Sequence, residues 1–151
     1  MGTAAGGELL CVAPVAPHKG HDVLLRALVA VAQLRWRCAC VGPLDRDPEF
    51  VTRLRRQAVA DGVADRVRLT GPLTGAALDR AYQSADLLVH ASRGETYGMV
   101  VSEALARGLP VIASDTGGLP DTLGHATGGC RPGLLDPTGT LVRWLTRCDA
   151  G

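Results

Sequence analysis

Two glutamates and the segment between them are the part of the sequence best suited to chemistry. Glu95 and Glu103 are two of only four glutamates in the chain, and seven residues separate them. They follow an apolar run at 86–91 and lead into a helical pattern, so we expect Glu95 in a loop and Glu103 nearly two turns into a helix. The Glu103 side chain is expected to be directed back towards the start of that helix.

The start of that helix is a candidate anion site, because its first backbone N–H groups have no partners within the helix. The residues expected to supply these groups are Gly98, Met99 and Val100. Such a cradle suits a diphosphate, and a carboxylate on each side can accept hydrogen bonds from hydroxyl groups. One carboxylate would then bind a sugar and the other a ribose. The alternative is a loop glutamate and a surface helix glutamate that bind nothing.

Two other groups could hold a metal ion, but their residues also have structural explanations. His18 and His21 straddle a glycine turn with no third ligand near, and we expect both to be solvated loop residues. Asp45 and Asp47 form a DxD pattern, which can hold a metal together with a diphosphate. However, Asp47 precedes Pro48, which is typical of a helix N-cap followed by proline at the first helical position. We therefore expect no metal site, and sensitivity to a chelator would test the metal-dependent alternative.

The elements that must position these residues follow from the alternation of apolar runs with helical periodicity. Strands are expected at 8–13, 36–41, 66–70, 86–91, 110–114 and 133–135, and helices at 20–34, 48–60, 74–84, 97–107 and 138–147. This order predicts an α/β fold, a Rossmann-like, doubly wound parallel sheet of about six strands with helices on both faces. A ligand would bind at the carboxyl ends of the strands, where the strand order reverses.

The composition excludes several classes of function. Sixteen Lys and Arg residues against 15 Asp and Glu give a net charge of +1, which argues against binding to nucleic acid or to an anionic membrane surface. Aromatic residues make up 3% of the chain, too few for base-stacking platforms. The patterns GxGxxG, GxxxxGK[ST] and GxSxG are absent, which disfavours an NAD site, a P-loop and a hydrolase elbow.

The cysteines and the hydropathy pattern indicate the compartment. The five cysteines have no CxxC spacing, so we expect small buried side chains rather than a zinc site or disulfides. No apolar run approaches the roughly 20 residues that cross a membrane, so no transmembrane segment is expected. Residues 1–7 lack the features of a secretory signal. These observations predict a cytoplasmic domain.

The glutamate pair and several other segments resemble the donor-binding half of retaining glycosyltransferases of family 4. The similarity covers about residues 8–145 and rests on ordered segments at 17–25, 41–42, 69–71, 85–89 and 95–120. The resemblance implies the C-terminal, donor-binding domain of a GT-B fold. It further implies transfer of a hexose from a nucleotide-sugar of the UDP or GDP type to an unknown acceptor, without a metal or another cofactor.

The resemblance also implies roles for individual residues. Lys19, the only lysine, would contact the donor diphosphate, and Glu95 would bind hydroxyls of the transferred sugar; these two are the candidate catalytic residues. Glu103 would bind the ribose diol, main-chain amides after Glu95 would cradle the sugar and phosphate, and a turn would flank the nucleobase. The candidate donor-binding residues are therefore Tyr97, Gly98, Met99, Val100, Glu103, Gly71 and Pro72.

Two departures from the family pattern leave an alternative open. Many members carry an arginine five or six residues before the lysine, where this chain has about Pro14; Arg93 or Arg131 could substitute. The chain also matches one of the family's two facing domains: residues 1–7 are expected to be a flexible segment, and 8–151 a nucleotide-sugar-binding domain whose partner, the N-terminal acceptor domain, is missing. The alternative is a non-catalytic nucleotide-binding or partner-docking module with the same fold, and binding of a nucleoside diphosphate would distinguish an enzyme from a docking module.

Overall fold

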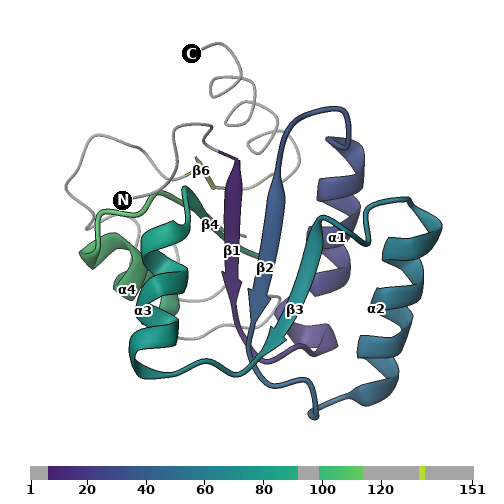
Figure 1. Ribbon diagram of the computed structural model, residues 1–151, viewed down its shortest axis with the longest axis horizontal. Helices are drawn as coiled ribbons and strands as arrows, with labels where there is room; N and C mark the ends of the chain where they lie inside the picture. The colour runs from purple at the N-terminus through teal and green to yellow at the C-terminus, as the bar shows by residue number, and fades with distance from the viewer. Residues whose placement is uncertain (1–6, 92–98, 114–132, 135–151) are drawn as a thin grey trace.

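The computed structural model describes residues 7–91, 99–113 and 133–134, and within them six strands form one sheet (Figure 1). The order is β3-β2-β1-β4-β5-β6, and every neighbouring pair is parallel. The strands are β1 (Glu8–Val12), β2 (Arg37–Val41), β3 (Val67–Gly71), β4 (Leu87–His90), β5 (Val111–Ala113) and β6 (Gly133–Leu134). The predicted Rossmann-like parallel sheet is confirmed, and its order reverses between β1 and β4.

The helices cover both faces of the sheet (Figure 1). On one side lie α1 (His21–Ala30) and α2 (Pro48–Ala60), and on the other α3 (Gly75–Ser84) and α4 (Met99–Ala106). A short 3-10 helix, η1 (Pro17–Lys19), connects β1 to α1. The strand side chains alternate between the two layers: Leu9 packs in the core beneath α1 and α2, whereas Leu10 packs beneath α3 and α4. Each such buried leucine stabilises the fold by roughly 1.5–3 kcal/mol.

The helix boundaries follow local signals at one end and tertiary contacts at the other. As predicted, Pro48 begins α2, and the Asp47 carboxylate accepts a hydrogen bond of 3.0 Å from the Phe50 amide. The helix expected at 20–34 is shorter, because α1 ends at Ala30. The Trp36 indole donates a hydrogen bond of 3.0 Å to the Val31 carbonyl, which stabilises the turn that replaces the last helical turn. The helix expected at 138–147 lies outside the described residues.

Three of the five cysteines are described, and all three are buried and not disulfide-bonded. Cys11, Cys38 and Cys40 lie on the side of the sheet that faces α1 and α2. A hydrogen bond with Cys40, and burial, raise the pKa of the Cys11 thiol well above its usual range. The prediction of small buried side chains is confirmed for these three, and Cys130 and Cys148 lie outside the described residues.

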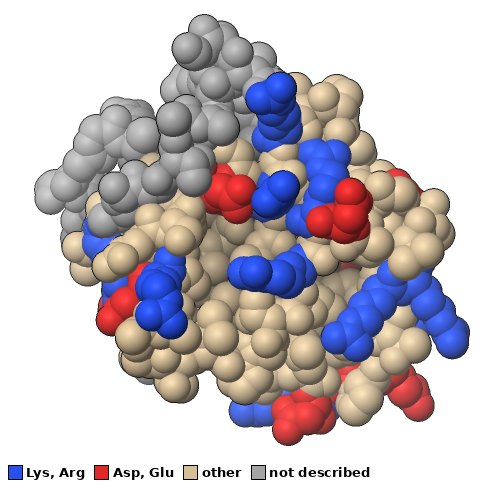
Figure 2. All heavy atoms as spheres, in the orientation of Figure 1, with Lys and Arg blue, Asp and Glu red and all other residues tan. Residues whose placement is uncertain are grey.

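One face of the described part of the chain carries mixed charge (Figure 2). On the face shown in Figure 2, Lys and Arg side chains are interspersed with Asp and Glu side chains. Mixed charge of this kind does not generate the strong field of one sign that attracts polyanions. Among the described helices, none is long and apolar enough to cross a membrane.

Candidate functional site

A cavity of about 360 Å³ opens at the carboxyl edge of the sheet, beside the ends of β1, β2, β3 and β4. This is the edge at which the strand order reverses between β1 and β4, where open α/β sheets bind their ligands. Four of the residues singled out from the sequence line it, namely Lys19, Pro72, Met99 and Val100. The fold therefore brings together residues from three separate segments of the chain.

The floor of this cavity is formed by loops that continue the pairing beyond the strand ends. The Ala13 amide donates to the Val41 carbonyl at 2.9 Å, and the Gly42 amide donates to the Gly71 carbonyl at 3.0 Å. A Cβ atom on Gly42 would lie 2.0 Å from the Ala13 carbonyl oxygen, so only glycine allows this approach. The Val41-Gly42 segment recognised in the sequence thus has a packing function at the floor of the cavity.

Lys19 reaches the cavity because the turn after it packs against the end of β4. Gly20 has a φ of +73°, and a Cβ atom there would lie 1.8 Å from the Ala91 carbonyl oxygen. Lys19 is partly buried, and it is the only charged side chain among the described residues that line the cavity. One cation among apolar walls favours a ligand that carries negative charge.

The first turn of α4 forms another wall of the cavity. Met99, which is 77% exposed, and Val100 both line it, and their backbone N–H groups lie in the first turn of the helix. Helix N-termini favour anions. The described part of α4 therefore presents a second feature suited to an anion, in addition to Lys19.

Glu103 lies one turn further along α4 and does not line the cavity. Its carboxylate accepts a hydrogen bond of 3.0 Å from Nε of Arg107, four residues later. Arg107 is its described partner, and the role of Glu103 in binding a ribose stays a prediction. Hydrogen bonds to Asp79 and to Glu103 raise the pKa of Arg107, which therefore stays charged.

Of the remaining predicted site residues, some are described and others are not. Gly71 ends β3 with a φ of +79°, immediately before Pro72 in the cavity wall. Glu95, Tyr97 and Gly98 lie outside the described residues, as do Arg93 and Arg131. Pro14 lines the cavity at about the position where many family members carry an arginine, so the structure adds no second cation there.

The two histidines of the glycine turn have different environments. His18 is exposed on η1, but His21 is only 2% exposed, so the expectation of a solvated residue is wrong for His21. Because Gly20 caps α1, the first helical side chain turns towards the sheet, where Nε2 of His21 lies 3.8 Å from Sγ of Cys11. Within residues 7–91, 99–113 and 133–134, no group of three or more His, Cys, Asp or Glu side chains is arranged to hold a metal.

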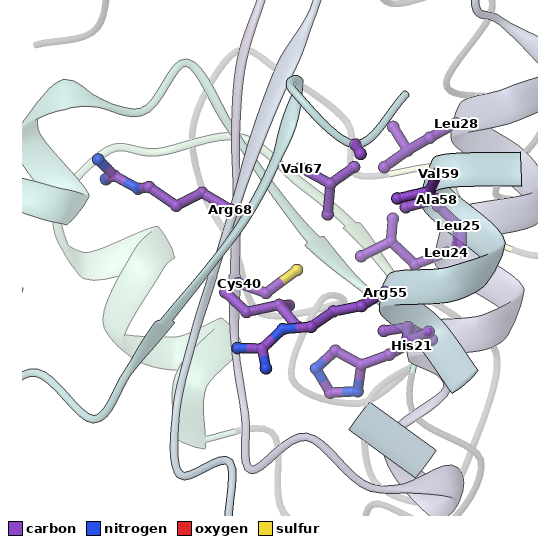
Figure 3. Close-up of a pocket in the computed structure, with 13 residues that line it drawn as sticks. His21, Leu24, Leu25, Leu28, Cys40, Arg55, Ala58, Val59, Val67 and Arg68 are labelled. Atoms are coloured by element: carbon purple, nitrogen blue, oxygen red, sulfur yellow. The ribbon is translucent and has the colours of Figure 1, made fainter. Parts of the chain in front are cut away.

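A second cavity, of about 380 Å³, lies between α1 and α2 above β2 and β3. Figure 3 shows its leucine side chains, with His21 and Arg55 towards one end. None of the residues predicted to bind a ligand lines this second cavity. The predicted binding residues therefore favour the cavity at the carboxyl edge as the candidate site, although the two cavities are similar in size.

His90 is a cavity residue that the sequence analysis did not single out. It is the last residue of β4, is 3% exposed, and lines the cavity at the carboxyl edge. The sequence did contain a signal for it, since His90 is a polar residue at the end of an otherwise apolar strand. The carboxyl ends of parallel strands form the ligand-binding edge of such a sheet.

Comparisons with known proteins identify the family of the chain. The family model described as "Glycosyl transferases group 1" matches residues 6–144. The chain is 40% identical over 149 residues to a D-inositol 3-phosphate glycosyltransferase of Salinispora tropica, a match that covers 93% of this chain and 31% of the relative. The chain spans about a third of the length of this relative and of a second D-inositol 3-phosphate glycosyltransferase, from Jonesia denitrificans.

Solved structures show the same fold. HepE of Anabaena in complex with UDP-glucose superposes with a TM-score of 0.78 at 26% identity, over 94% of this chain and 38% of that one. The C-terminal domain of a glycosyl transferase group 1 family protein from Francisella tularensis superposes with a TM-score of 0.77 at 19% identity, over 96% of this chain and 76% of that one. The second likeness concerns the fold alone.

Proposed function

The chain belongs to the glycosyl transferases group 1 family, and on that premise we propose that its carboxyl-edge cavity binds the nucleotide-sugar donor of a retaining, family 4 glycosyltransferase. The observation that supports this most directly is the meeting of Lys19, Pro72 and the first turn of α4 around one cavity at the strand reversal. The UDP-glucose bound to HepE supports a nucleotide-sugar of the UDP type as the ligand to test first.

The proposed chemistry is transfer of a hexose from the donor to an acceptor hydroxyl. The bond between the anomeric carbon and the diphosphate oxygen breaks, and negative charge builds up on the departing diphosphate. The acceptor oxygen bonds to that carbon, and the hydroxyl proton of the acceptor passes to the departing diphosphate. Lys19 and the N–H groups at the start of α4 would stabilise that charge, which is electrostatic preorganisation and needs no metal. Glu95 would bind the sugar hydroxyls, and Glu103 the ribose diol.

A non-catalytic module with the same fold is the second candidate. It is favoured by Pro14, which stands where many family members have a second cation, because Lys19 is the single charged side chain among the described residues of the cavity. A docking module need not bind nucleotides, whereas the transferase requires a nucleoside diphosphate at this cavity. Titration with UDP, GDP, CDP and ADP, with and without a chelator, separates the two candidates and also tests the metal-dependent alternative through Asp45 and Asp47.

Replacing Glu103 with alanine is expected to weaken binding of the preferred nucleoside diphosphate by about 10- to 150-fold, because a charged acceptor contributes roughly 1.5–3 kcal/mol. The fold should be unaffected, since the Glu103 side chain is 54% exposed. Titration calorimetry measures the affinity, and circular dichroism checks the fold. Glu49→Ala removes another exposed glutamate, in the first turn of α2, and should leave the affinity unchanged. If Glu103→Ala binds as tightly as the parent chain, the ribose assignment is wrong.

A further inference from the structure

Arg107, just beyond the end of α4, contacts three side chains on two helices. Its Nε donates to Glu103 at 3.0 Å, and its Nη2 donates to Asp79 of α3 at 2.6 Å. Its guanidinium carbon also lies 4.6 Å from the centre of the Tyr82 ring. The planar guanidinium is therefore held by two carboxylates and an aromatic face, and lysine cannot reproduce such a geometry.

These contacts link α3 to the C-terminal end of α4, and Asp79 and Glu103 each lie within one turn of a residue that lines the carboxyl-edge cavity. Leu78 on α3 and Val100 on α4 line the cavity. Asp79 follows Leu78 directly, and Glu103 follows Val100 by three residues, which places it on the same side of the helix. The Arg107 contacts thus join the two helices immediately behind the wall that both contribute to the cavity.

The two helices connect to different parts of the proposed donor site. The turn that contains Pro72 leads directly into α3, and α4 carries both the phosphate-facing first turn and Glu103. The described contacts of Arg107 engage Oε1 of Glu103, which leaves Oε2 able to accept further hydrogen bonds. An exposed glutamate without such a partner samples several rotamers, and fixing it on binding lowers affinity.

We propose that Arg107 is a positioning residue, which holds the Glu103 carboxylate for the ribose diol and joins it through Asp79 to the helix behind the nucleobase turn. This inference rests on the proposed binding of a nucleoside diphosphate. A surface ion pair with no such role would contribute only modestly to the stability of the fold. Its removal would change the affinity for every ligand equally. The two possibilities differ in whether the effect of Arg107 depends on the diol.

The test compares UDP with 2′,3′-dideoxy-UDP, which lacks the diol, in the full chain and in Arg107→Met. We expect Arg107→Met to weaken UDP binding by about 3- to 10-fold, the effect of freeing one rotamer-rich side chain, and to leave the affinity for dideoxy-UDP unchanged. In the Glu103→Ala background, the same substitution should have no further effect on UDP. Arg107→Lys keeps the charge and the aliphatic stem over Tyr82, and its diol-dependent loss should be smaller than that of Arg107→Met.

A matched control is Arg26→Met on α1, which removes an i, i+4 ion pair with Asp22 (3.9 Å) without touching α3 or α4, and which should bind both nucleotides normally. Equal weakening of UDP and dideoxy-UDP by Arg107→Met, or an additive loss with Glu103→Ala, would overturn the positioning role while leaving the proposed function intact. If Arg107→Met does not fold, Arg107→Lys carries the same comparison. If the parent chain binds neither nucleotide, the proposed function fails, and the role of Arg107 fails with it.

Discussion

Gly20→Ala is expected to destabilise the chain by roughly 2–5 kcal/mol, because left-handed backbone strain and a backbone clash act together at this position. The φ of +73° disfavours any residue with a Cβ atom, and that atom would lie 1.8 Å from the Ala91 carbonyl oxygen. Relieving the clash requires the turn to move away from the end of β4. Since Lys19 precedes this turn, UDP affinity should fall as well. Urea denaturation measures the loss of stability.

Gly62→Ala is the matched control for this effect. Gly62 has the same φ of +73°, but a Cβ atom there would meet nothing within 4 Å. The control should therefore lose only the cost of the left-handed conformation, about 1–2 kcal/mol, and keep its nucleotide affinity. If the two substitutions destabilise the chain equally, Gly20 is not required for close packing of the Lys19 turn against the end of β4.

The second large effect concerns activity. We expect the 151-residue chain by itself to bind the donor weakly, to hydrolyse it slowly at best, and to transfer no measurable sugar. Holding donor and acceptor in reacting geometry can supply about 7–11 kcal/mol of a transfer barrier, and closure of the site excludes competing water. The chain covers 31% of the Salinispora tropica relative. The resemblance to family 4 implies that the acceptor binds mainly in the facing domain.

This expectation can be checked by adding the portion of a relative that the chain does not cover. The purified chain is assayed with UDP-glucose and a panel of acceptors, alone and after fusion to the remaining portion of a full-length relative. Transfer should appear only in the fusion. Robust transfer by the isolated monomer would show that the acceptor binds within these residues.

Local signals made much of the fold predictable from the sequence. The Asp47-Pro48 pair marked the start of α2 correctly, because a cap and a proline at the first helical position act within one turn. The alternation of strands and helices gave the parallel sheet, and the rule for such sheets identified the carboxyl edge that Lys19, Met99 and Val100 share. These inferences needed only short-range pattern and a general rule of topology.

The errors arise at side-chain and tertiary contacts. A hydrogen bond from the Trp36 indole to the Val31 carbonyl stabilises the turn after α1, and helical periodicity does not report a contact of this kind. His21 is buried because the turn before it packs against β4, 70 residues further along the chain. The contact of Glu103 with Arg107 was also not predictable from local pattern, because Arg107 is held as well by Asp79, 28 residues earlier in the chain. No periodicity in the sequence reports such contacts.

The central claim is that the carboxyl-edge cavity binds a nucleoside diphosphate, and amide chemical shifts recorded by NMR during titration with UDP test it most directly. We expect the largest changes at Lys19, Leu73 and Val100, which line that cavity, and none at Leu28 and Ala58 in the cavity between α1 and α2. GDP is titrated in parallel, and the nucleotide that binds more tightly should perturb the same amides. Changes confined to Leu28 and Ala58, or no changes with either nucleotide at millimolar concentration, would contradict the assignment of the donor site.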